Sequence, residues 1–259
     1  MKRLIFALTL VTAACAQPAL APPQVGFIQD SENALRPVFG IAGNFILGDA
    51  ISQGITSSAY SGSLVLLKTD SAIVATDVQG QVLQSMDAPP GPALFALYKD
   101  GSPAFAYLES VNLLFEWCGS GFQMVRFDGN LFLADSVLSI FAPDALHVGF
   151  LVRRGGDLLD VRIAVDSGES DSQATINGVT APALILASGD IVYADADGLV
   201  IRRADASEVH LNAQLPSGFS LAQMGAGWVA LTDFGSGAQF AVRVTPGREG
   251  IYTLPGVNQ

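Results

Sequence analysis

The sequence predicts an all-β protein and, within that class, a β-propeller with six blades favoured over five. Three observations lead to this prediction: short apolar runs of strand length, tight-turn residues between them, and a regular repeat. In the 259 residues, the second run of each repeat starts at Ser63, Ser102, Ala145, Asp190 and Gly227, giving steps of 39, 43, 45 and 37 residues. Propeller blades repeat at roughly 40 residues, and the runs are too short and too rich in β-branched residues for helical repeats.

The clearest repeat extends from residue 93 to 127. It contains four runs with the length and composition of strands. Asp100-Gly101 and Gly119-Ser120-Gly121 separate neighbouring runs, and glycine reaches the positive φ of hairpin turns without steric strain. This stretch therefore predicts a four-stranded meander, which is one blade.

Four similar units are predicted at residues 55–86, 136–176, 183–211 and 219–254. A hairpin and a further strand between Val25 and Leu47 precede them, and this segment should complete the ring, which removes exposed sheet edges. Six blades with an incomplete first blade fit the length better than five blades with an added closing strand. A β-sandwich is the alternative fold. Pro37 predicts an edge strand or the start of a strand, because proline cannot donate to a sheet ladder.

The first run of each unit is rich in small residues. Inner strands crowd around the axis of a propeller, so small side chains are expected there. The residues concerned are Ser57, Ser58, Ala59, Ala96, Ser136, Ser139, Ala187, Ser220 and Ala222.

The N-terminus resembles an export signal, predicted here for residues 1–16. Lys2 and Arg3 precede an apolar run, Leu4 to Ala14, that is too short to span a bilayer as a helix. Cleavage before Cys15, with lipid attached to that cysteine, and ordinary cleavage after Ala16 both fit the residues. Residues 17–24 then form a proline-rich tether and residues 25–259 a single propeller domain. We expect an exported protein: a periplasmic or outer-membrane lipoprotein, whose only membrane attachment is the lipid, or a secreted protein.

With this leader and this repeat, the chain resembles extracytoplasmic bacterial β-propellers. The resemblance covers most residues after Gln24 and is one of pattern, because the Gly-His and Trp-Asp signatures of one common propeller family are absent. It implies a rigid ring whose loops present the functional surface.

Composition excludes some functions. The chain has 24 acidic and 13 basic residues, so a nucleic acid backbone would be repelled and nucleic acid is not an expected partner. Cys118 has no partner for an intramolecular disulfide, and we interpret it as a small buried hydrophobic residue. His147 and His210 fall in separate units without metal-ligand spacing, so no zinc site is predicted.

Acidic residues recur at the predicted turns between the second and third strands. These turns share one face with the connections between blades. Calcium takes several oxygen ligands, so the acids define a candidate cation site, although aspartate is also common in turns for local reasons. The candidate metal ligands are Asp70, Glu109, Asp157, Asp197 and Asp233, with Asp195 nearby and Asp87 and Asp128 on the same face.

Two functions follow as hypotheses. The first is a non-enzymatic exported propeller that acts as an interaction scaffold or ligand-binding module in the cell envelope, without a cofactor, for an unidentified protein or small molecule. The second is a calcium-dependent hydrolase or lyase acting on a sugar or lactone. Fold class alone does not choose between them.

Overall fold

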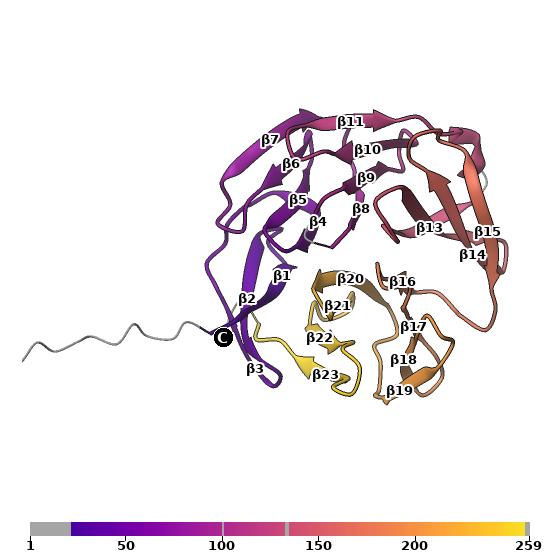
Figure 1. The fold of residues 1–259 in the computed structure, drawn as a ribbon. Coiled ribbons are helices and arrows are strands. Elements are labelled where there is room, and N and C mark those ends of the chain that lie inside the picture. Colours follow the sequence, from indigo (N-terminus) through magenta and orange to yellow (C-terminus); the bar gives the residue numbers. More distant parts are fainter. Residues whose placement is uncertain (1–21, 100, 133–134, 257–259) are drawn as a thin grey trace, which may run out of the picture.

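Six antiparallel sheets surround a common axis in the computed structural model, which describes residues 22–99, 101–132 and 135–256 (Figure 1). Each sheet consists of strands that are consecutive in sequence. The protein is therefore an all-β, six-bladed β-propeller, as the sequence predicts.

Blade 1 has three strands and the other five blades have four. Blade 1 contains β1 (Gln24–Gln29), β2 (Leu35–Ile41) and β3 (Asn44–Leu47). Blade 2 contains β4 (Ile55–Ser61), β5 (Leu64–Thr69), β6 (Ala72–Thr76) and β7 (Val82–Asp87). Blade 3 contains β8 (Leu94–Leu97), β9 (Ala104–Leu108), β10 (Leu113–Trp117) and β11 (Phe122–Val125).

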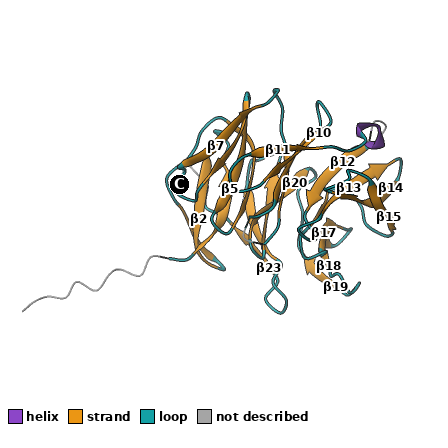
Figure 2. Cartoon of the chain, turned by 45° about the horizontal axis from the view of Figure 1, so that its top comes forward, coloured by secondary structure: helices purple, strands orange, loops and turns teal. Residues whose placement is uncertain are grey.

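A short 3-10 helix, η1 (Gly129–Phe132), connects blade 3 to blade 4 and is the helical turn drawn in purple in Figure 2. Blade 4 contains β12 (Ser136–Phe141), β13 (His147–Arg154), β14 (Asp157–Ala164) and β15 (Ser170–Ile176). Blade 5 contains β16 (Ala183–Ile185), β17 (Ile191–Ala194), β18 (Gly198–Arg202) and β19 (Glu208–Asn212). Blade 6 contains β20 (Phe219–Gly225), β21 (Trp228–Asp233), β22 (Gln239–Arg243) and β23 (Gly250–Thr253).

The core is a set of apolar layers between neighbouring blades. Second strands such as β5 are almost fully buried, whereas outer strands such as β7 are exposed along most of their length. Between blades 3 and 4, the ring of Phe150 lies 5.3 Å from that of Tyr107 and 4.8 Å from that of Phe132, measured between centroids. Aromatic pairs at such distances add to the stability that burial supplies.

Pro37 lies in the central strand of blade 1, so the prediction of an edge or strand-start position was wrong. Its carbonyl accepts a hydrogen bond of 2.9 Å from the N–H of Gly48. Regular pairing between β2 and β3 ends with Val38 opposite Leu47, one pair before Pro37. The missing N–H is therefore accommodated where the ladder stops rather than at a sheet edge.

Five strands form the inner ring. β4, β8, β12, β16 and β20 contact one another in that order, and β20 also contacts β4 directly, so the ring closes. β1 contacts both β4 and β20 (Figure 1). We call the junction of β1, β4 and β20 the seam.

β1 runs in the direction opposite to the inner strands. A β carbon added at Gly225, the last residue of β20, would lie 2.2 Å from the carbonyl oxygen of Val25, which belongs to the beginning of β1. At the other end of β1, the carbonyl oxygen of Gln29 accepts a hydrogen bond of 2.7 Å from Gln239, the first residue of β22. β1 therefore has the direction of a second strand, and in the described residues blade 1 contributes no strand to the inner ring.

Candidate functional site

A cavity of about 300 Å³ opens at the seam, which we call the seam cavity. It lies at the end of the ring where the inner strands begin, the same end that carries the turns between second and third strands. Three blades contribute to it, since β1, β4 and β20 to β22 all provide side chains. Its polar lining residues include Gln29, Asp30, Ser57, Ser58, Ser220, Gln223, Thr232 and Gln239.

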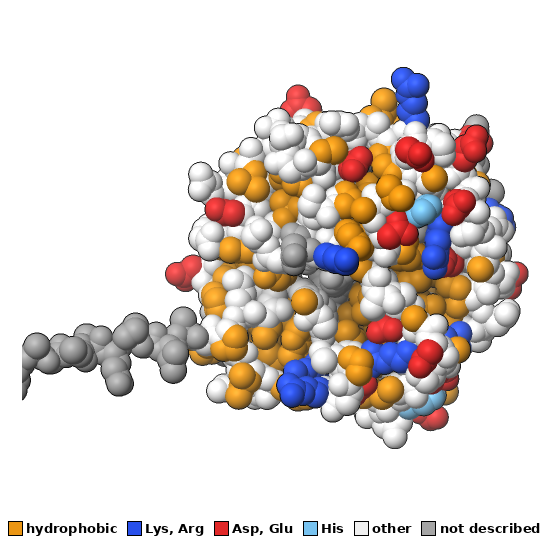
Figure 3. Space-filling view, in the orientation of Figure 1, with side chains coloured by type: hydrophobic (Ala, Val, Ile, Leu, Met, Phe, Trp, Pro, Cys, Tyr) orange, Lys and Arg blue, Asp and Glu red, His pale blue; other side chains and the backbone are white. Residues whose placement is uncertain are grey.

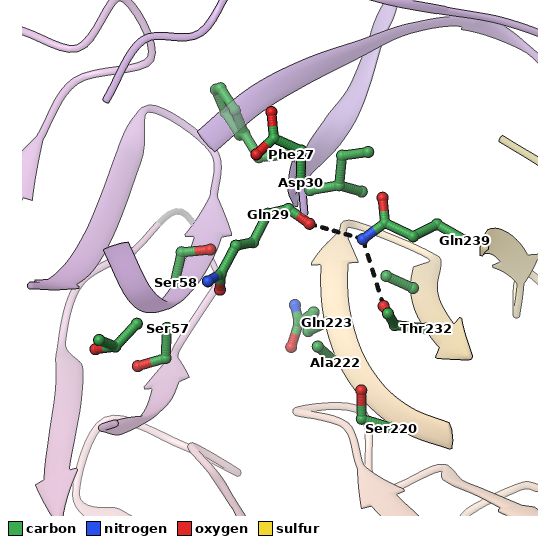
Figure 4. A pocket seen from close by; sticks show the side chains of 13 residues that line it. Phe27, Gln29, Asp30, Ser57, Ser58, Ser220, Ala222, Gln223, Thr232 and Gln239 are labelled. Atoms are coloured by element: carbon green, nitrogen blue, oxygen red, sulfur yellow. Dashed lines mark hydrogen bonds between the residues drawn. The ribbon is translucent and has the colours of Figure 1, made fainter. Parts of the chain in front are cut away.

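Hydroxyl and carboxamide groups dominate the polar part of the seam cavity. Figure 4 shows Ser57 and Ser58 on one side of it and Ser220, Ala222 and Gln223 on the other. The side chains of Ser58, Ser220 and Gln223 form no hydrogen bond with another residue of the described ranges. Their donors and acceptors are therefore available to a bound molecule.

The remaining amides of the seam cavity hold the blades together. The Nε2 group of Gln29 donates to the carbonyl of Ile55 at 2.8 Å and so joins blade 1 to blade 2. The Nε2 group of Gln239 donates to the carbonyl of Gln29 at 2.7 Å and to the hydroxyl of Thr232 at 3.4 Å, and so joins blade 6 to blade 1. These bonds fix the walls of the cavity at the point where the ring closes.

Asp30 is the one titratable residue among the described residues that line the seam cavity. Its side chain is fully buried, and its carboxylate accepts a 2.6 Å hydrogen bond from Arg36 and 2.9 Å bonds from the N–H groups of Glu32 and Ala34. Burial opposes ionisation, but the hydrogen bonds from Arg36 and the two N–H groups outweigh it and lower the pKa of Asp30. Asp30 is therefore an ionised, fully paired group with a structural role.

Gln223 connects the seam cavity to the rest of the central channel. Its side chain also lines a second cavity of about 140 Å³ between the inner strands and a third of about 360 Å³ at the opposite end. Ser57, Ser58 and Ser139 line the second cavity. The predicted small residues of β4, β8, β12 and β20 do lie on inner strands, whereas Ala187 lies two residues after the end of β16.

The five candidate metal ligands lie in five different blades. Asp70, Glu109, Asp157 and Asp197 are exposed, and Asp233 is half-buried. Within residues 22–99, 101–132 and 135–256, no three His, Cys, Asp or Glu side chains are grouped so that they could hold a metal ion. The structure therefore does not bring the predicted ligands together, and a calcium site at these residues stays a prediction.

Two of these turns show why aspartate is there. The side chain of Asp233 accepts hydrogen bonds from the N–H of Gly235 and the hydroxyl of Ser236, and the latter bond above all lowers the pKa of Asp233. Asp195 accepts 2.9 Å bonds from the N–H groups of Asp197 and Gly198, which lower its pKa. Local hydrogen bonding of this kind is the usual reason for aspartate in turns.

Both histidines have carboxylate neighbours that sequence spacing did not reveal. The Nδ1 atom of His147 lies 2.9 Å from Asp144, and its Nε2 atom lies 3.5 Å from Asp171. His210 lies 3.3 Å from Asp195 and 3.7 Å from Glu208. His147 is the first residue of β13 in blade 4, and His210 lies in β19 of blade 5. Figure 3 shows histidine side chains among acidic and basic ones on the face in view.

The predicted lipid attachment residue, Cys15, and the whole predicted export signal lie outside the described residues. So do residues 17–21 of the predicted tether, whereas Gln24 is already the first residue of β1. Cys118 is exposed in the turn after β10, so its interpretation as a buried residue was wrong. None of the described segments is a helix of the length and hydrophobicity needed to cross a membrane.

No family model matches the sequence, and no curated protein matches it. Solved structures with a similar fold include a protein of unknown function from Bacteroides caccae, with a TM-score of 0.51, 14% identity and coverage of 90% of this chain and 99% of that chain. They also include PorZ of Porphyromonas gingivalis, described as an essential bacterial surface component of the type-IX secretion system, with a TM-score of 0.50 and 11% identity. That match covers 89% of this chain and 31% of PorZ. At these identities the similarity shows the fold alone.

Proposed function

We propose that the protein is a non-enzymatic, exported β-propeller that acts as a ligand-binding module or interaction scaffold in the cell envelope. The observation that supports binding most strongly is the seam cavity, whose walls come from blades 1, 2 and 6. In it, the side chains of Ser58, Ser220 and Gln223 present hydroxyl and amide groups that are not bonded to another described residue. Ligand sites of proteins are preformed concave surfaces with a few well-placed polar groups, and this cavity has that character.

Binding is favoured over catalysis because of the groups that the cavity offers. General acid or base catalysis needs a titratable side chain that can reach the reacting group. Asp30 is committed to Arg36 and to two main-chain N–H groups, so it is not free to exchange a proton with a ligand. The alternative of a calcium-dependent hydrolase or lyase has no comparable observation in its favour.

The export part of the proposal rests on the sequence of residues 1–16. PorZ, which has the same fold, is described as a bacterial surface component, so an exported propeller of this kind has a precedent. We further propose that Cys15 carries the lipid and that the propeller lies in the periplasm or at the outer membrane.

The export part is tested by expressing the full chain with its own leader in a bacterium, labelling with palmitate and fractionating the cells. We expect label on the wild-type chain in the membrane fraction and none on Cys15→Ser. An unlabelled chain cleaved after Ala16 would contradict the lipid anchor but keep export. A chain that retains residues 1–16 and stays in the cytoplasm would contradict export itself.

A further inference from the structure

We infer that the seam cavity binds a neutral, hydroxyl-rich ligand of the sugar class and that the bound ligand bridges blades 1, 2 and 6. This inference rests on the proposed function of the cavity as a ligand site. It adds the chemical class of the ligand and a consequence of binding for the stability of the ring.

The charges in and around the seam cavity disfavour the binding of an ionic ligand. The described lining residues other than Asp30 are uncharged, and the Asp30 carboxylate is already bonded by Arg36. The whole chain has a formal net charge of −11, which repels anions from its surroundings. A charged ligand that entered the cavity would lose hydration without finding a free counter-charge, and that loss is large in a partly buried site.

Hydrogen bonding favours a ligand that both donates and accepts. The hydroxyl groups of Ser58 and Ser220 can do either, and the carboxamide of Gln223 offers two donors and one acceptor oxygen. None of the three is bonded to another described residue. A sugar hydroxyl also donates and accepts, so a single pyranose can satisfy groups on both sides of the cavity at once.

The rest of the wall is apolar. Phe27, Ile28, Ala222 and Ala230 line the seam cavity beside its polar groups. A pyranose ring has hydroxyls around its edge and a C–H face, so it can match both kinds of surface. The volume of about 300 Å³ is at the small end of the range for ligand sites, which suits one sugar residue better than a peptide strand.

The polar groups come from separate blades. Ser58 belongs to β4, and Ser220 and Gln223 belong to β20. Gln29 belongs to β1, and because its Nε2 group already donates to Asn33 and Ile55, it offers a ligand its Oε1 atom as an acceptor. A ligand bonded to all three strands adds a link across the seam that exists only while the ring is closed. Because the ligand binds only the folded ring, binding raises the unfolding temperature by an amount that grows with the logarithm of the ligand concentration above Kd.

The test is thermal unfolding and calorimetric titration of the chain from Gln17 to Gln259 with glucose, galactose and N-acetylglucosamine, each separately. Glucuronate serves as a charged sugar, and N-acetylglycinamide serves as a neutral amide without hydroxyls. Sugars at high concentration also stabilise proteins by exclusion from their surface, without a site. The double variant Ser58→Ala/Gln223→Ala measures the part that depends on the cavity, and Gln84→Ala/Ser85→Ala, on the exposed strand β7, is the matched control.

We expect at least one neutral sugar to raise the melting temperature by roughly 5–10 °C at a hundredfold excess over Kd. The same rise in melting temperature should be seen in Gln84→Ala/Ser85→Ala. In Ser58→Ala/Gln223→Ala, only the part of the rise that is due to exclusion of sugar from the protein surface should remain. With glucuronate the rise should be much smaller. Equal rises in both double variants for all three sugars would overturn the inference.

Two outcomes separate this inference from the proposed function. A cavity-dependent rise with N-acetylglycinamide but with none of the sugars would overturn the sugar class and leave a ligand-binding module. Failure of export in the fractionation experiment would overturn the proposed location whatever the sugar titrations give.

Discussion

Replacing Gly225 by alanine should open the seam. The new β carbon would lie 2.2 Å from the carbonyl oxygen of Val25, whereas a carbon and a carbonyl oxygen in contact are about 3.3–3.6 Å apart. β1 and β20 would therefore have to separate by about 1 Å. Their contact buries Met224, at 1% exposure, and the shift also strains the hydrogen bond between Gln239 and Gln29.

The expected decrease in the free energy of unfolding follows from the poorer packing of β1 against β20 and from the weakened hydrogen bond. Overpacking of a well-packed core costs about 1–3 kcal/mol, and a lost hydrogen bond adds about 1 kcal/mol. A total of about 2–4 kcal/mol corresponds to a fall in melting temperature of roughly 5–12 °C for a domain of this size. Differential scanning calorimetry of wild type and Gly225→Ala at equal concentration measures the difference.

Gly121→Ala is the matched control, because a β carbon there meets no atom within 4 Å. It should melt at or slightly above the temperature of wild type, since alanine restricts the unfolded chain more than glycine does. If Gly225→Ala melts together with Gly121→Ala, β1 does not pack against β20 as described and the account of the seam fails.

Three further substitutions test the interior. Asp30→Asn should lower the free energy of unfolding by about 2 kcal/mol at pH 7, because it removes the charge paired with Arg36. Since the folded pKa of Asp30 is below 3.8, urea titrations should show that this difference is complete above pH 3.8 and disappears as pH falls through the folded pKa. Lys68 is fully buried, its ammonium group donates to the main-chain oxygens of Thr69 and Asp70, and burial lowers its pKa below 10.5. Lys68→Met should therefore stabilise by about 1–3 kcal/mol at neutral pH, and the gain should shrink as pH rises towards 10.5; a destabilised variant would contradict this. Phe150→Ala should lower the free energy of unfolding by about 3–5 kcal/mol in the same titrations. A decrease below about 1 kcal/mol would show that Phe150 does not pack in an apolar layer between blades 3 and 4.

Strand positions could be predicted from the sequence because the signals for them are local. Turn residues and short apolar runs recur within each unit, and the predicted unit from residue 136 to 176 coincides with the first and last residues of blade 4. The number of blades followed from the spacing of the repeats. An incomplete first blade was also predictable, because only three runs precede Ile55.

The seam could not be predicted, because it depends on residues far apart in the chain. The bond between Gln239 and Gln29 joins residues 210 positions apart, and no local pattern marks either residue. Ser58 and Ser220 were predicted to lie on inner strands, but Gln223 was not singled out, since a glutamine within a strand belongs to no motif. The predicted site was placed at acidic residues instead. Asp233 shows that an aspartate in a turn can be explained by the hydrogen bond that it accepts from the turn backbone.

Sugar binding in the seam cavity can be observed directly in a crystal structure of the chain from Gln17 to Gln259, soaked with the sugar that gives the largest cavity-dependent stabilisation. We expect density for one sugar residue in the seam cavity, with its hydroxyls within hydrogen-bond distance of Ser58, Ser220 and Gln223. Sugar density only on another surface, or only solvent between β4 and β20 at saturating sugar, would contradict sugar binding in this cavity.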